Sequence, residues 1–282
     1  MMVEKILQSI RKLPAFPASI QKVSDLLRDD DYSTQELVKV IQYDQAITAN
    51  IMKMSNSAYF GSRQKIRTIH EAVVFLGRRH LQSAVFTAGA SRFFQASKGG
   101  YVDKGKALWE HSVAVAVMSQ ILSRHLRQRE DQELYTAALM HDIGKLILGE
   151  FVQDAYEKIQ IQMERRSCSF LEAEEEILGI NHAELGGRIA DQWNFPPAIR
   201  DGIAFHHRPD LLDDEDSIAG LIYLSDQFCL MAGIDGGLDG LAHRGIGSVM
   251  KQFQLREVDL ERNLIVLLDE LDKAADVLQL VN

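Results

Sequence analysis

The sequence predicts an all-α protein. Apolar residues recur at the three- and four-residue spacing of a helix along nearly the whole chain, whereas the alternation of a half-buried strand is hard to find. The five prolines lie at the edges of the apolar segments rather than within them. With 282 residues, of which 46% are hydrophobic and 25% charged, the chain can bury a substantial core. We therefore expect about a dozen helices.

Local start signals place several of these helices. Ser33 followed by Glu36 has the spacing of a capping box, which predicts a helix from this point through Gln42. Asn181 is a suitable N-cap for the segment that follows it, and Pro196-Pro197 is typical of a helix start. The apolar stripes of the first three segments contain Ile20, Val23, Leu26, Leu27, Leu37, Val40, Ile41, Ile47, Ile51 and Met54.

Two glycine-bearing stretches interrupt the helical pattern and predict the domain organisation. Residues 95–105 replace the apolar stripe with small and polar side chains, which indicates a domain seam. Residues 233–247 hold six of the 19 glycines and precede two amphipathic helices, expected at roughly 248–254 and 260–279. We therefore predict three parts, residues 1–97, 98–235 and 236–282.

Charge and cysteine content exclude several functional classes. The chain has 31 Lys and Arg against 40 Asp and Glu, a net charge of -9, which disfavours binding to nucleic acid or to an anionic membrane surface. Cys168 and Cys229 lie far apart, so we expect neither a disulfide scaffold nor a cysteine zinc site, and we expect a cytoplasmic protein. The N-terminus lacks the apolar run of a secretory signal, and no uncharged run reaches the ~18 residues of a membrane span.

Five of the nine histidines and two aspartates form an ordered series within apolar helical segments. On a helix, His111 shares a face with Val115 and Met118, so its ring is expected to face the core. Asp226 is the only charged residue between Asp216 and Asp235, and a buried carboxylate there needs a cation, a metal or a proton. The candidate metal ligands are His111, His141, Asp142, His182, His206, His207 and Asp226.

This set of side chains predicts a divalent metal site. Imidazoles and carboxylates that converge from separate helices suit iron, manganese or zinc. Asp142 has two oxygens and can contact two ions, an arrangement that activates water, while Lys145 can offset charge on a phosphate oxygen. We therefore expect one or two ions and take Asp142 and Lys145 as candidate catalytic residues.

Other interpretations of single residues stay open. A lone histidine on a helix face is usually structural, and this interpretation is kept for His70, His80, His125 and His243. Consecutive residues on a helix point about 100° apart, so we expect one metal ligand from the pair at 206 and 207, with His207 favoured and the other ring on substrate or solvent. Asp226 could instead be a buried capping or ion-paired carboxylate, and Lys145 a lysine near a helix C-terminus.

The ordered set of candidate ligands resembles that of the HD superfamily of metal-dependent phosphohydrolases, and HDIGK at 141–145 is similar to its signature. The stretches LPAFPASIQKVSDLL at 13–27, 37–60 ending in NSAYF, and IHEAVVFLG at 69–77 resemble the bacterial HDOD family, the HD-related output domains. The resemblance covers about residues 10–232. It implies an N-terminal helical subdomain at 1–97 packed on an HD-like metal-binding subdomain at 98–235, with a C-terminal helical appendage at 236–282.

The resemblance also implies a function. HDOD proteins act in bacterial signal transduction, and many are regarded as non-catalytic. The related HD-GYP phosphodiesterases cleave cyclic di-GMP and follow their histidine pair with Glu and a Gly-Tyr-Pro element, whereas RPDLLDDED follows here, so that activity is not expected. Ala107 stands where some of them carry a glutamate for a third metal.

Two functions therefore remain. One is a bacterial HDOD regulatory protein that binds signalling proteins and retains its metal site. The alternative is an active metal-dependent phosphohydrolase or phosphodiesterase acting on a nucleotide or another phosphoester. Neither a nucleic acid nor a membrane is an expected partner.

Overall fold

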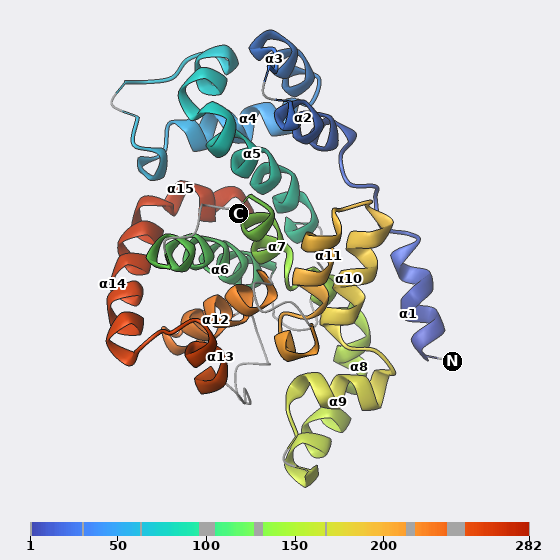
Figure 1. Cartoon of the computed structure of the whole chain (residues 1–282). Coiled ribbons are helices and arrows are strands. Elements are labelled where there is room, and N and C mark those ends of the chain that lie inside the picture. Colours follow the sequence, from blue (N-terminus) through green and yellow to red (C-terminus); the bar gives the residue numbers. More distant parts are fainter. Residues whose placement is uncertain are drawn as a thin grey trace. The chain divides into compact units, whose positions relative to one another are not determined.

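The all-α prediction is confirmed by the computed structural model, which describes residues 2–29, 31–62, 64–95, 105–126, 132–166, 168–212, 218–235 and 246–281 (Figure 1). The described part contains fifteen α-helices and no strand. The expected dozen is an underestimate, because helices as short as α15 (Ala275–Leu278) leave no periodic signal. Residues 96–104 of the seam predicted at 95–105, residues 236–245 of the stretch at 233–247, and His243 among them, lie outside the described residues.

Helix contacts divide the chain into two compact units. One contains Met1–Leu13 and Ala96–Leu267, and the other contains Pro14–Gln95 and Leu268–Asn282. Helix α14 (Glu257–Lys273) contributes to both. The three-part division expected from the sequence stays a prediction, because contacts do not test which part folds by itself.

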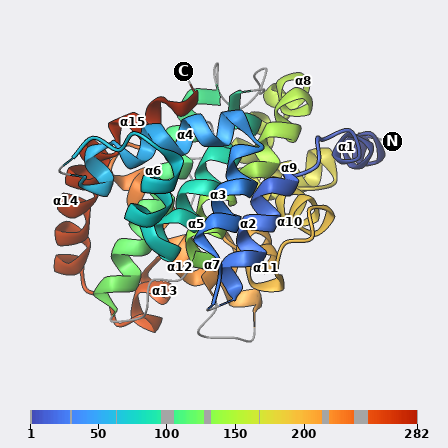
Figure 2. The ribbon, with the colours of Figure 1, turned by 90° about the horizontal axis from the view of Figure 1, so that it is seen from above.

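The smaller unit is built around α5 (Ile69–Gln95), which packs against the three helices that precede it (Figure 2). Helix α5 bends at Gly77, whose φ of +61° lies in the left-handed region that favours glycine. Ser33 caps the second of the three helices by accepting a hydrogen bond from the Glu36 amide, as predicted. The other elements of this unit are α2 (Ala18–Arg28), α3 (Thr34–Gln42), α4 (Gln45–Ser55), η1 (Ala58–Phe60), α15 and η3 (Gln279–Val281).

A single carboxylate connects three helices of this unit. Asp44 is the N-cap of α4, and its Oδ1 accepts a hydrogen bond from the Ile47 amide at 3.2 Å and pairs with Arg92 of α5. Its Oδ2 accepts from the Ser19 hydroxyl of α2 at 3.4 Å. Burial alone raises the pKa of Asp44, but Arg92 and the Ile47 amide together lower it below its usual range.

Replacing Asp44 by alanine is expected to lower the free energy of unfolding by about 1–2 kcal/mol, because the cap is lost together with a partly exposed ion pair. Asparagine caps equally well, so Asp44→Asn should lose only the ion pair. Because folding lowers this pKa, the ion pair's contribution is complete above the unfolded value of about 3.9 and declines as the pH falls through the folded value. Urea denaturation should therefore show the gap between wild type and Asp44→Asn closing below about pH 4, and a constant gap would contradict this assignment.

The larger unit surrounds the predicted site. Helix α6 (Gly105–His125) packs against α7 (Gln132–Met140) and α12 (Ile218–Met231). Helix α10 (His182–Gln192) packs against α8 (Ile143–Arg166) and α11 (Pro197–Ala204). Asn181 caps α10 through a hydrogen bond from the Glu184 amide, and Pro197 begins α11, as predicted. The remaining elements are α1 (Met2–Ile10), α9 (Phe170–Leu178), η2 (Pro209–Leu211) and α13 (Ile246–Gln252).

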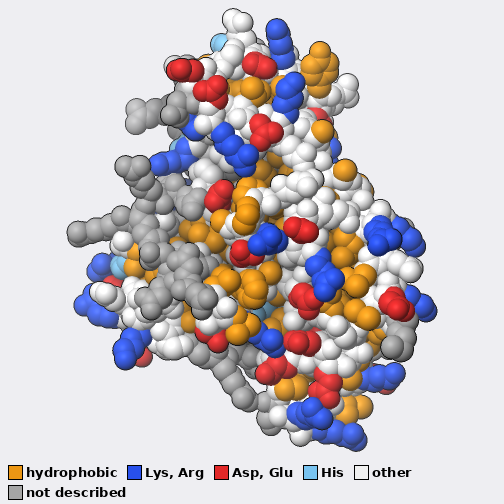
Figure 3. Space-filling model, turned by 45° about the vertical axis from the view of Figure 1, so that its right-hand side comes forward, with side chains coloured by type: hydrophobic (Ala, Val, Ile, Leu, Met, Phe, Trp, Pro, Cys, Tyr) orange, Lys and Arg blue, Asp and Glu red, His pale blue; other side chains and the backbone are white. Residues whose placement is uncertain are grey.

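The surface mixes both signs of charge. Figure 3 shows basic and acidic side chains interspersed over the face in view, with no extended basic patch on it. None of the described helices is long and apolar enough to cross a membrane.

Candidate metal centre

The structure brings all seven predicted ligands together inside the larger unit. His111 lies on α6 and Asp226 on α12, while His182 is the first residue of α10. Six of the seven side chains are buried, and His207 is half-buried. Helix packing thus brings together His111 and Asp226, which are 115 residues apart in the sequence.

Two pairs of ligands lie in turns rather than on helices. His141 and Asp142 form the turn between α7 and α8, so they do not lie within a helix as the apolar helical segment around them predicted. His206 and His207 follow the end of α11 at Ala204. Because that helix has already ended, the angle of about 100° between consecutive helical side chains does not apply to this pair. Both rings therefore reach the cluster, rather than the ring of His207 alone.

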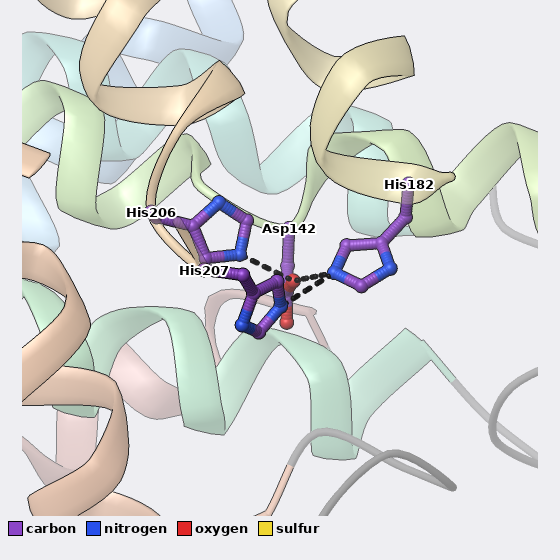
Figure 4. A group of neighbouring side chains, drawn as sticks. All are labelled: Asp142, His182, His206 and His207. Carbon is purple, nitrogen blue, oxygen red and sulfur yellow. Dashed lines mark hydrogen bonds and ion pairs between the residues drawn. The ribbon is translucent and has the colours of Figure 1, made fainter. Parts of the chain in front are cut away.

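Asp142 lies at the centre of the cluster (Figure 4). Its Oδ1 is 3.5 Å from Nε2 of His182 and 3.7 Å from Nε2 of His206. Its Oδ2 is 3.3 Å from Nε2 of His141 and 3.8 Å from Nε2 of His111. The two oxygens therefore face two different sets of imidazoles.

The seven residues form two groups. Each residue of a group offers one potential ligand atom, and within a group these atoms all lie within 4.8 Å of one another. One group contains Asp142, His182, His206 and His207, and the other contains His111, His141 and Asp226. In the first group, the Nε2 atoms of His182 and His207 are 2.9 Å apart. This geometry suits one or two ions, with Asp142 between the two positions.

Backbone carbonyls orient three of the imidazole rings. In each, Nδ1 lies 2.7–2.9 Å from a carbonyl oxygen, which can only accept a hydrogen bond, so Nδ1 carries the hydrogen. The lone pair of each neutral ring is then on Nε2, the atom that faces the cluster. The pairs are His111 with Ile234, His141 with Ala138 and His206 with Ile203.

Buried atoms without hydrogen-bond partners support a cation at this position. They are Nε2 of His141, Oδ1 of Asp142 and Nε2 of His206. An unsatisfied buried polar group costs about 1–3 kcal/mol. His206 and Asp142 belong to one of the two groups and His141 to the other. Divalent cations held by the two groups would satisfy these atoms, so the residues present fit a metal site.

The charges in the cluster are strongly coupled. Burial lowers the pKa of His111, but Asp226, with Oδ1 3.1 Å from its Nε2, raises it above the usual value. Burial likewise raises the pKa of Asp226, and the pairing with His111 more than reverses that effect. Burial and the neighbouring His141 lower the pKa of His206 to about 3, which keeps that ring neutral and able to bind a metal.

Lys145 is buried and its Nζ lies 2.6 Å from Oδ2 of Asp142. It belongs to the first turn of α8, so the interpretation as a lysine near a helix C-terminus is wrong. The ammonium instead balances the charge of the central carboxylate. For Asp142, burial raises the pKa, and His141 and Lys145 bring it well below its usual range.

One residue of this centre, Glu174 on α9, is not among the residues predicted from the sequence. Its side chain is buried, and its Oε2 lies 2.7 Å from Nδ1 of His182. A signal was available, because helical spacing places Glu174 on the face of Phe170, Leu171 and Leu178, which are all buried. Glutamates at 172, 175 and 176 concealed it within an apparently solvated run.

Imidazoles from several helices and turns surround a buried carboxylate, which defines an all-helical protein with a candidate His/Asp metal centre. The HDOD domain matches residues 13–209 of the sequence. The chain therefore belongs to the HDOD domain family.

Solved structures share the fold. An HDOD domain protein of unknown function from Geobacter sulfurreducens is 22% identical, with a TM-score of 0.77, covering 99% of this chain and 96% of that one. A candidate phosphohydrolase from Shewanella amazonensis is also 22% identical, with a TM-score of 0.74 and 98% of both chains covered. A candidate signal transduction protein from Marinobacter aquaeolei is 18% identical, with a TM-score of 0.73, covering 96% of this chain and 60% of that one.

A curated relative from Treponema pallidum, an uncharacterized protein, is 27% identical over 207 residues, which are 72% of this chain. The match spans 39% of the length of that relative.

Proposed function

We propose that this chain is a bacterial HDOD signal-transduction protein in which the HD-type centre binds one or two divalent ions, iron, manganese or zinc, and stabilises the larger unit. The burial of the centre carries this proposal. Six candidate ligands expose 3% or less of their surface, and among the seven only His207 is half-buried. Such enclosure suits an ion that holds helices together, because catalysis needs room for a substrate beside the ion.

The same proposal places the protein in the cytoplasm, with other signalling proteins as partners. Its two cysteines are free thiols, which suits a reducing compartment. The names of structurally similar proteins include both a signalling protein and a phosphohydrolase, so they support either function.

A second function, hydrolysis of a nucleotide or another phosphoester, is favoured by a specific observation. Asp142 lies between two ligand groups and Lys145 contacts it at 2.6 Å. A bound divalent ion supplies Lewis acidity and lowers the pKa of water. In this function Asp142 orients the centre, Lys145 balances negative charge, and His207 is the ligand that faces an arriving phosphate.

A hydrolysis assay distinguishes these functions. Protein purified without chelator is expected to contain near-stoichiometric metal and to leave phosphomonoesters, nucleotides and cyclic dinucleotides intact when Mn²⁺ or Fe²⁺ is added. Metal-dependent hydrolysis that is lost in Lys145→Met, with metal content retained, would establish the enzyme instead. The exposed His70→Ala, outside the centre, is the control for both readouts.

A further inference from the structure

We infer that Glu174 is a positioning residue that sets the metal affinity of the group formed by Asp142, His182, His206 and His207. The inference rests on the proposed metal centre and adds to it a residue outside the ligand set. The carboxylate of Glu174 holds the His182 ring in the orientation and tautomer that directs Nε2 at the ion.

The contacts of Glu174 define this role. Its Oε2 lies 2.7 Å from Nδ1 of His182 and accepts a hydrogen bond from the His182 amide at 3.1 Å. A carboxylate oxygen accepts, so Nδ1 donates and Nε2 of the neutral ring keeps its lone pair. That Nε2 faces Oδ1 of Asp142 at 3.5 Å and Nε2 of His207 at 2.9 Å.

A purely structural role explains less of this arrangement. Asn181 already caps α10 by accepting from the Glu184 amide at 2.8 Å, so the helix does not depend on Glu174 for its cap. A buried carboxylate is costly unless a strong partner compensates it, and the shortest hydrogen bond of Glu174 is to the His182 ring. The position of Glu174 is therefore explained by its two hydrogen bonds to His182.

His182 is also the exception among the four buried rings of the centre. The other three donate from Nδ1 to neutral backbone carbonyls, whereas His182 donates to a carboxylate. A carboxylate makes the ring a stronger donor toward a metal, and loss of such a partner typically costs about 10–100-fold in metal affinity. We therefore expect the two ligand groups to respond differently to changes at residue 174.

The test is a calorimetric titration of the metal-free full chain with MnCl2. Glu174→Ala should weaken one class of Mn²⁺ site by about 10–100-fold and leave the other unchanged. In Glu174→Gln the amide oxygen can accept both hydrogen bonds without the charge, so we expect a smaller loss, below about tenfold. Glu176→Ala and Glu176→Gln are matched controls, because Glu176 lies on the same helix but pairs with the surface residue Arg166.

A second readout separates positioning from stability. In metal-free protein, ¹⁵N NMR of the His182 ring should show hydrogen on Nδ1 in wild type and Glu174→Gln, and a mixture of tautomers in Glu174→Ala. Should Glu174→Ala fail to fold, the loss of Mn²⁺ affinity in Glu174→Gln, compared with that in Glu176→Gln, tests the inference. Unchanged affinities in the Glu174 variants overturn this inference but leave the metal centre intact, whereas wild type that binds no Mn²⁺, Fe²⁺ or Zn²⁺ overturns both.

Discussion

Asp142→Ala is expected to remove most of the bound metal, because both ligand groups lose the carboxylate that lies between them. Elemental analysis of wild type and variant, purified side by side without chelator, measures the loss. The variant also leaves the buried Lys145 ammonium without its carboxylate at 2.6 Å. Breaking a buried ion pair in this way typically costs about 3–5 kcal/mol, so a lower free energy of unfolding is expected too.

A double variant separates the two effects. Asp142→Asn combined with Lys145→Met removes both charges, so it should recover much of the stability lost in Asp142→Ala while remaining poor in metal. Thermal denaturation and metal content are measured on the same samples. Near-stoichiometric metal in Asp142→Ala would show that this carboxylate is not a ligand.

Gly144→Ala is expected to have the second large effect. A Cβ at Gly144 would lie 2.0 Å from the carbonyl oxygen of His182 and 2.9 Å from its carbonyl carbon. Both atoms belong to the backbone of α10, so neither can move aside as a flexible side chain would. We expect the free energy of unfolding to fall by about 3 kcal/mol, at the upper end of typical overpacking costs, with reduced metal content because His182 is displaced.

Two other glycines give graded controls for this prediction. At Gly186 the closest atom to the added Cβ would be a side-chain methyl, Cγ2 of Ile203, at 2.8 Å, and its other neighbours lie at 3.5 Å or more, so a smaller loss is expected. At Gly247, within α13, nothing lies within 4 Å, and alanine should be neutral or slightly stabilising. Urea denaturation should order the three variants accordingly, and a Gly144→Ala protein as stable as wild type would refute the close approach of α8 and α10.

Helix locations could be predicted because their signals are local. The caps Ser33 and Asn181 and the start at Pro197 depend only on the next few residues, and each is found as expected. The turn at His141 and Asp142 was not predicted, because nothing in the sequence between α7 and α8 breaks the helical pattern. The end of α11 before His206 escaped prediction for the same reason.

The sequence by itself determined the fold class and the candidate ligands, apart from the choice between His206 and His207, because helical periodicity and polar residues in apolar segments are visible without any partner. Only the tertiary structure decided that both His206 and His207 join the cluster, that each oxygen of Asp142 faces its own imidazoles, and that Glu174 supports His182. These properties are contacts between residues distant in the chain. They depend on distances of a few ångströms that packing sets and that residue spacing along a helix does not encode.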